Sequence, residues 1–266
     1  MLEIRALELH VSHACNLACE GCSHYSDQGH KGLTPLADAD RWMRAWAGRV
    51  RPRAFSLLGG EPALHLDLPG FVALARGHWP GTPVRVVSNG FLLHRHPALP
   101  AALAGAPGSW LEVSVHHNSP EYRDRFAPVG DLLRGWVRDH GVRVVVLESY
   151  ANWTRRYRGR GAGMEPFADG RPRASWERCP ARYCAQLHDG RVWKCPALAY
   201  LPMQAARHRL SAAWDPYLAY RPLEPGCTDA ELAAFFARED EPACGMCPAE
   251  PGWFRIPLPL RGAAGT

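Results

Sequence analysis

Three cysteines near the N-terminus constrain this chain more than any other feature of its sequence. Cys15, Cys19 and Cys22 follow directly after a strand-like apolar run over residues 7–11. Thiolates favour soft metals, so the loop predicts iron–sulfur chemistry or zinc rather than a hard cation. Three thiolates can each bind one iron of a four-iron cluster, which leaves one iron open to a small molecule. The alternative is a structural zinc site with His13 or His24 as fourth ligand.

The total of nine cysteines bears on where the chain works. The sequence has no signal-peptide pattern and no apolar run long enough to span a membrane, so we expect a cytoplasmic protein without a membrane partner. In a reducing compartment such a cysteine count indicates metal ligands rather than disulfides. The net charge of +5 includes an arginine-rich run over residues 155–160. We interpret that run as a solvated loop, which makes a nucleic-acid partner unlikely.

Strand and helix patterns alternate through the first two-thirds of the chain. This alternation predicts an α/β fold, a partial (β/α)6 TIM-like barrel whose ligands collect at the carboxyl ends of parallel strands. We expect a sixth strand within residues 150–176. Thr34 is expected to cap the first long helix. The expected strands are 7–11, 54–58, 84–88, 111–115 and 142–148, and the expected helices are 34–50, 68–79 and 122–140, the last interrupted near Pro128.

Unusual residues follow each of the expected strands. After residue 58 comes Gly59-Gly60-Glu61-Pro62, and after residue 87 comes Ser88-Asn89. Two adjacent glycines allow backbone to approach a ligand closely. Because parallel strands end at one edge of the sheet, we expect these residues to meet the cysteine loop.

The pattern changes near residue 176, where regular alternation stops and six cysteines follow before residue 248. We therefore predict a barrel over residues 1–175, a small cluster-bearing domain over 176–257 and a frayed tail over 258–266.

The cysteine loop together with the Gly-Gly-Glu-Pro turn resembles the radical S-adenosylmethionine (SAM) superfamily. The resemblance implies a [4Fe–4S] cluster on Cys15, Cys19 and Cys22, with SAM bound to its open iron. It further implies a 5′-deoxyadenosyl radical that abstracts hydrogen from an unactivated C–H bond. The residues that it implies for SAM binding are Gly59, Gly60, Glu61, Pro62, Ser88, Asn89 and Ser114.

The chain departs from the family pattern at Gly21, where many members carry an aromatic residue next to the adenine. We expect Tyr25 or His24 to supply the missing contact.

The later cysteines resemble the auxiliary-cluster domains called SPASM and twitch. By this resemblance Cys179, Cys195, Cys244 and Cys247 hold a second [4Fe–4S] cluster, and a zinc knuckle is the alternative. Cys184 and Cys227 are the two cysteines that neither cluster would use. Since a thiol can donate a hydrogen atom to a substrate radical, both are candidate hydrogen donors.

The resemblance favours hydrogen abstraction from a carbinol C–H of an aminosugar or cyclitol in antibiotic biosynthesis. Epimerisation with a cysteine donor is the leading expectation. The alternatives are dehydrogenation to a ketone with the auxiliary cluster as electron acceptor, modification of a ribosomal peptide, and a zinc protein that binds nucleic acid. The chain starts almost at the first strand, so we expect no N-terminal leader-binding domain.

The expected partners are a small polyhydroxylated substrate and a reductant of the flavodoxin or ferredoxin type. Candidate polar contacts to the substrate are His116, His117, Asn118, Glu148, Tyr150 and Asn152, and an aminoglycoside would further require Glu112, Glu148 or Glu165 near the site.

Overall fold

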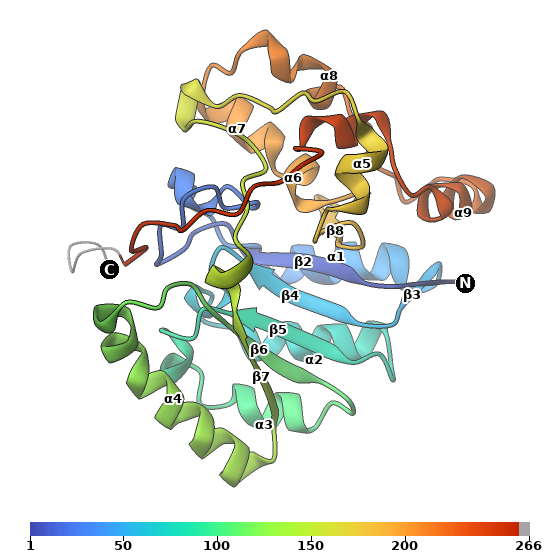
Figure 1. The fold of residues 1–266 in the computed structure, drawn as a ribbon. Coiled ribbons are helices and arrows are strands. Elements are labelled where there is room, and N and C mark those ends of the chain that lie inside the picture. The colour runs from blue at the N-terminus through green and yellow to red at the C-terminus, as the bar shows by residue number, and fades with distance from the viewer. Residues whose placement is uncertain (261–266) are drawn as a thin grey trace.

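A seven-stranded sheet carries the fold of the computed structural model, which describes residues 1–260. The strand order is β7-β6-β5-β4-β2-β8-β9, and every neighbouring pair is parallel except the antiparallel β8–β9 pair (Figure 1). The bounds are β2 (Leu7–Ser12), β4 (Phe55–Gly59), β5 (Val84–Ser88), β6 (Trp110–Val115), β7 (Arg143–Glu148), β8 (Ala185–His188) and β9 (Arg191–Trp193).

Helices connect the parallel strands, as the alternating pattern predicts. They are α1 (Leu36–Ala47), α2 (Leu68–His78), α3 (Leu99–Ala104) and α4 (Pro120–His140). Short strands β1 (Leu2–Ile4) and β3 (Val50–Pro52) form a separate parallel pair. The partial-barrel fold class is confirmed, and the five strands expected over residues 7–148 are present.

The two faces of the sheet differ in chemistry. Along β2, Leu7, Leu9 and Val11 belong to the main apolar core, because side chains alternate between the faces of a strand. Glu8 and His10 are buried on the opposite face. The carboxylate of Glu8 accepts hydrogen bonds from Arg85 and Gln186, both at 2.7 Å. The inner face of the half-barrel is therefore polar although it is buried.

The prediction of a sixth strand within residues 150–176 is wrong. That segment contains η4 (Ser149–Asn152), η5 (Gly161–Gly163) and α5 (Pro172–Glu177). The chain instead crosses over the strand ends and adds β8 beside β2, at the opposite side of the sheet from β7 (Figure 1). This pairing joins residues about 180 positions apart, which no local pattern reveals.

Two local predictions also fail. Helix α4 runs unbroken through Pro128, because its buried face (Val129, Leu133 and Trp136) packs on the core and offsets the lost hydrogen bond. Thr34 does not cap α1, since its hydroxyl donates instead to the carbonyl oxygen of His10 at 2.7 Å.

The C-terminal region adds a second apolar core around Tyr157, Tyr200 and Trp214. Its helices are α6 (Pro196–Ala199), α7 (Leu201–Arg207), α8 (Asp215–Leu218) and α9 (Asp229–Ala237). A final segment, residues 248–260, which we call the strap, returns to the cysteine loop (Figure 1). The expected tail is thus corrected for residues 258–260, while 261–266 lie outside the described residues. Over residues 1–260, no helix is both long and apolar enough to cross a membrane.

Candidate active site

The three N-terminal cysteines line one cavity of about 190 Å³ at the carboxyl ends of the strands. Their loop follows β2, whose pairing with β4 shifts register between His10 and Ser12. The wall opposite the loop comes from the ends of β4, β5 and β6. The predicted residues that line this cavity are Cys15, Cys19, Cys22, Gly59, Gly60, Ser88, Asn89 and Ser114.

Gly59 and Gly60 hold the root of the cysteine loop. The amide of Gly60 donates to the carbonyl oxygen of Ser12, and that of Glu61 to Ala14, both at 2.8 Å. A Cβ atom on Gly59 would lie 2.1 Å from the Ser12 oxygen, and one on Gly60 would lie 2.1 Å from the Ala14 oxygen. The glycines are therefore required by close backbone packing as well as by their place at the cavity.

Glu61, which the resemblance implies for SAM binding, is not among the residues that line the cavity. Its carboxyl group is completely buried and accepts hydrogen bonds from Ser88 Oγ at 2.6 Å, Asn89 N at 2.8 Å and Ala63 N at 3.0 Å. Burial raises the pKa of Glu61 to about 7. Pro62 is buried and is the first residue of the short 3₁₀ helix η2 (Pro62–Leu64). Glu61 thus positions the end of β5.

Asn89 connects the end of β5 to the cysteine loop. Its Nδ2 donates to Asn16 Oδ1 at 2.7 Å and lies 3.8 Å from Cys15 Sγ. A donor beside a ligating thiolate orients it and tunes the bound metal.

The thiols of this loop are disfavoured as free thiolates. Burial raises the pKa of Cys22 to about 11 and that of Cys19 well above its ordinary value. Metal binding requires deprotonated thiols, so a bound metal would supply the free energy that burial removes.

The adenine neighbour expected from Tyr25 is not found there. Tyr25 is buried in the second core, and its hydroxyl donates to the carbonyl oxygen of Ala197 at 3.0 Å. His24 does line the cavity, and so does Trp153, which the sequence did not single out. Gly21 adopts a left-handed φ of +73°, and its Cβ would point at Arg155 and Phe254. An aromatic side chain at position 21 would therefore be strained.

Of the six candidate substrate contacts, only His116 lines the cavity. Burial lowers the pKa of His116 to about 4, and its ring meets Trp153 edge to face. The acids expected near an aminoglycoside are not grouped there: Glu112 pairs with Arg85, and Glu165 accepts from Ser211. The cavity's own acid is Asp27, whose pKa burial raises to about 6. The other candidates lie outside the cavity lining: His117 accepts from the Ser119 amide, Asn118 accepts from Arg255, and Glu148, Tyr150 and Asn152 follow the end of β7.

The strap covers the outer side of the cysteine loop. The amide of Ala18 donates to the carbonyl oxygen of Pro259 at 2.8 Å, and Leu17 bridges to Leu260. Ile256 is buried against Leu17 and Cys19. The arginine-rich run contributes here as well, because Arg155 pairs with Glu20.

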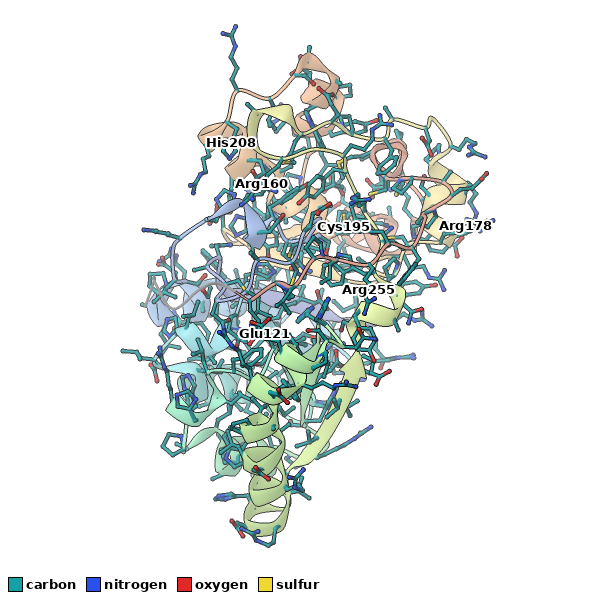
Figure 2. All side chains as sticks on the ribbon, turned by 60° about the vertical axis from the view of Figure 1, so that its left-hand side comes forward. Glu121, Arg160, Arg178, Cys195, His208 and Arg255 are labelled. Atoms are coloured by element: carbon teal, nitrogen blue, oxygen red, sulfur yellow. The ribbon has the colours of Figure 1, made fainter. Side chains whose placement is uncertain are left out.

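The four cysteines predicted for an auxiliary cluster line one second, almost entirely apolar cavity. Cys179 follows α5, Cys195 follows β9, and Cys244 and Cys247 bracket the end of η7 (Pro242–Met246). Figure 2 shows Cys195 within the C-terminal part of the molecule and Arg178 at its surface. The indole Nε1 of Trp176, which lines this cavity, is buried without a hydrogen-bond partner among the described residues. The four thiols and this unpaired donor form a set that suits an iron–sulfur cluster, because cluster sulfides and thiolates accept hydrogen bonds.

No three His, Cys, Asp or Glu side chains in residues 1–260 converge on a single ion position. A four-iron cluster does not need such convergence, because each thiolate binds a different iron.

The two remaining cysteines lie away from the first cavity. Burial and the nearby Glu8 carboxylate raise the pKa of the Cys184 thiol at the inner face of the sheet. Cys227 accepts a hydrogen bond from Arg49 at 3.2 Å and packs against the main core. Neither lines the cavity that holds Cys15.

Comparisons with known proteins agree with this geometry. A family model described as Radical SAM superfamily matches residues 9–146, slightly more than half of the chain. A probable GTP 3′,8-cyclase of Methanopyrus kandleri is 32% identical over 138 residues, which cover 50% of this chain and 42% of that protein. The chain thus spans less than half the length of this relative.

Among solved structures, BtrN in complex with AdoMet and 2-DOIA has a TM-score of 0.50 at 19% identity. The match covers 82% of this chain and 85% of BtrN. SuiB of Streptococcus suis bound to S-adenosylmethionine has a TM-score of 0.43 at 17% identity, covering 56% of this chain and 36% of SuiB.

Proposed function

Because this chain belongs to the radical SAM superfamily, we propose that it oxidises a carbinol of an aminosugar or cyclitol to a ketone. The first cluster would be held by Cys15, Cys19 and Cys22. A second cluster would be held by Cys179, Cys195, Cys244 and Cys247. When bound, the first cluster and SAM supply the 5′-deoxyadenosyl radical that takes the carbinol hydrogen.

The chain's own residues organise this site in three ways. Gly59 and Gly60 hold the cysteine loop against the end of β4. Glu61 fixes Ser88 and the amide of Asn89 at the wall of the cavity. Trp153 and His24 line the first cavity and offer flat surfaces to an adenine ring.

The observation that carries the proposal is the different placement of the two groups of C-terminal cysteines. Four of the six line a single apolar cavity, one thiol for each iron of a four-iron cluster. This number suits a fully ligated cluster that exchanges electrons. Cys184 lies one residue before the Leu7–Ala185 pair, which places it level with Ala6, just before β2 begins. Six residues separate that level from Ser12, which corresponds to ~20 Å of strand. A hydrogen donor at Cys184 is therefore disfavoured, and with it the epimerisation that we expected first.

The lining of the first cavity supports a hydroxyl-bearing substrate. Serines 23, 26, 88, 114 and 149 all line it, and Asp27 adds an acid that suits an amino group. The likeness to BtrN, whose structure contains 2-DOIA, supports the same substrate class.

The test is turnover in deuterated water. Anaerobically reconstituted enzyme would be mixed with SAM, a reductant and a panel of aminocyclitols, and the products weighed by mass spectrometry. We expect a product two mass units lighter than its substrate, with no solvent deuterium at the reacting carbon. Cys184→Ala and Cys227→Ala should retain this turnover. An isomer of the substrate that carries one solvent deuterium would overturn the proposal in favour of epimerisation.

A further inference from the structure

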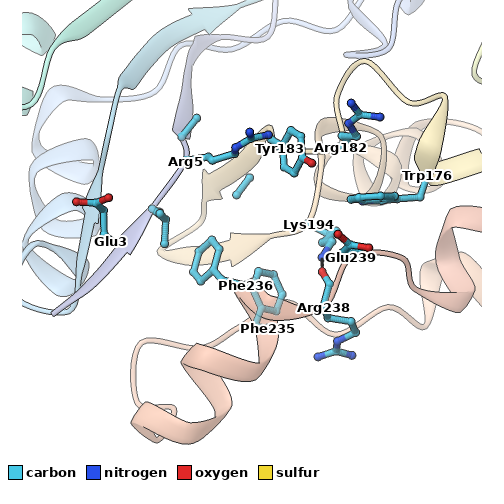
Figure 3. Close-up of a pocket in the computed structure, with 13 residues that line it drawn as sticks. Glu3, Arg5, Trp176, Arg182, Tyr183, Lys194, Phe235, Phe236, Arg238 and Glu239 are labelled. Atoms are coloured by element: carbon cyan, nitrogen blue, oxygen red, sulfur yellow. Dashed lines mark hydrogen bonds between the residues drawn. The ribbon is translucent and has the colours of Figure 1, made fainter. Parts of the chain in front are cut away.

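A third cavity, of about 230 Å³, is rich in cationic and aromatic side chains (Figure 3). It lies between β1, the start of β8 and the end of α9. Arg5 and Tyr183 lie side by side at its rim, and Phe235 and Phe236 of α9 close its lower side. We call Arg5, Tyr183, Arg182, Trp176 and Lys194 the arginine–aromatic surface.

Guanidinium groups and rings alternate along this surface. The guanidinium carbon of Arg5 lies 3.9 Å from the centre of the Tyr183 ring. Arg182 lies 5.2 Å from Tyr183 and 5.5 Å from Trp176. The guanidinium carbon of Arg173 also lies near this ring, 4.9 Å from the centre of Trp176. Stacking orients a guanidinium group without neutralising its charge.

The nearby carboxylates are already matched by other cations. Glu3 pairs with Arg51 and Arg53, and Glu239 pairs with Arg173. Buried Glu241 lies 3.6 Å from Lys194 and 3.9 Å from Arg238. Within residues 1–260, neither Arg5 nor Arg182 has a carboxylate within salt-bridge distance. Arg5 and Arg182 therefore leave a local excess of positive charge on this surface.

The surface shares a wall with the second cysteine cavity. Trp176, Arg182 and Lys194 line both cavities. A partner seated on this surface would therefore approach whatever the four cysteines hold, with one layer of side chains between.

We propose that the arginine–aromatic surface docks an acidic one-electron carrier protein of the flavodoxin or ferredoxin class. The inference rests on the proposed function, which leaves one electron on the second cluster after each turnover. The carrier's oxidised flavin or iron–sulfur centre accepts that electron, so the second cluster is oxidised by one electron and the carrier reduced by one.

The form of the surface suits a protein rather than a small anion. Its unmatched arginines stand at an open rim, and the Tyr183 ring is 40% exposed beside them. Arginine and tyrosine are enriched among the residues that dominate protein interfaces. Redox complexes use small interfaces whose association is steered by charge.

The test measures binding of an acidic flavodoxin to the anaerobic holoenzyme. Arg5→Glu combined with Tyr183→Ala reverses the charge of Arg5 and removes the exposed ring that it stacks on, and neither residue lines the second cysteine cavity. Arg134→Glu is the matched control, because Arg134 is exposed on α4 at the opposite side of the sheet (Figure 1). We expect the Kd for flavodoxin to rise about tenfold or more in the double variant at low salt and to be unchanged in the control. Oxidation of the pre-reduced enzyme by flavodoxin should slow in parallel.

Formation of 5′-deoxyadenosine with dithionite should be unchanged in both variants, since dithionite needs no docking site. Its absence in the unmodified chain would count against the proposed function, whereas the Kd tests the docking surface separately. An equal Kd in the double variant and the control would overturn the docking proposal. A single-stranded oligonucleotide that binds more tightly than flavodoxin, and is lost in the double variant, would also overturn it.

Discussion

The hydroxyl of Ser88 donates a hydrogen bond of 2.6 Å to the buried carboxyl group of Glu61. Through this contact the turn after β4 fixes the end of β5, and Asn89 carries the constraint on to the cysteine loop. The residue that the family resemblance assigns to the cofactor thus acts on the wall of the cavity.

This arrangement predicts a specific pH dependence of stability. The pKa of Glu61 is about 7 in the folded chain against 4.5 ordinarily, because of burial. The folded state therefore holds the proton more tightly, so stability falls as pH rises from about 4.5 to about 7. Over this pH range, the shifted pKa of Glu61 lowers the free energy of unfolding by about 3 kcal/mol. Urea unfolding of the cluster-free chain at several pH values measures it. Glu61→Gln should flatten the slope relative to the unmodified chain, and identical slopes would contradict the prediction.

Gly60→Ala should remove the first cluster and leave the second. The new Cβ would lie 2.1 Å from the Ala14 oxygen, so the root of the cysteine loop must move. We expect iron to fall from about eight to about four per chain, with the stability of the chain reduced by about 1–3 kcal/mol. Gly48→Ala is the control, since nothing lies within 4 Å of its Cβ position. Full iron content in Gly60→Ala would show that the glycine is dispensable.

Ile256→Ala should loosen the strap over the cysteine loop. Ile256 is 2% exposed and packs against Leu17 and Cys19. Removing a buried side chain of this size costs about 2–5 kcal/mol when the site cannot collapse. We expect the first cluster to lose iron faster in air. The decay of the cluster's absorbance measures this rate. Ile256→Val should behave nearly as the unmodified chain, and equal rates in both variants would argue against a protective strap.

Trp176→Phe should make the second cluster harder to reduce. Its buried Nε1 has no hydrogen-bond partner in the described chain, and Trp176 is one of the residues that line the cavity of the four cysteines. Loss of one hydrogen bond of ~1 kcal/mol to a cluster corresponds to a potential more negative by about 40 mV. A redox titration followed by electron paramagnetic resonance measures the shift. An unchanged potential would mean that the indole does not donate to the cluster.

Local patterns in the sequence predict the parts of this molecule that depend on neighbouring residues. The strand that ends at Ser88 was placed without error, and both cysteine groups converge as expected. The pairing of β8 with β2 and the contact of Pro259 with Ala18 join distant segments, so no local pattern reveals them. Trp153 enters the site from such a crossing segment. The Gly-Gly-Glu-Pro motif gives Glu61 but not the direction of its side chain, so its contacts with Ser88 and Asn89 could not be predicted.

The most direct test of the account is the formation of 5′-deoxyadenosine from SAM by three reconstituted and reduced proteins. The account predicts that the unmodified chain and Cys195→Ala both cleave SAM, while Cys19→Ala does not, because Cys19 lines the first cavity and Cys195 lines the second. Stoichiometric zinc in place of iron, with no 5′-deoxyadenosine from the unmodified chain, would contradict it.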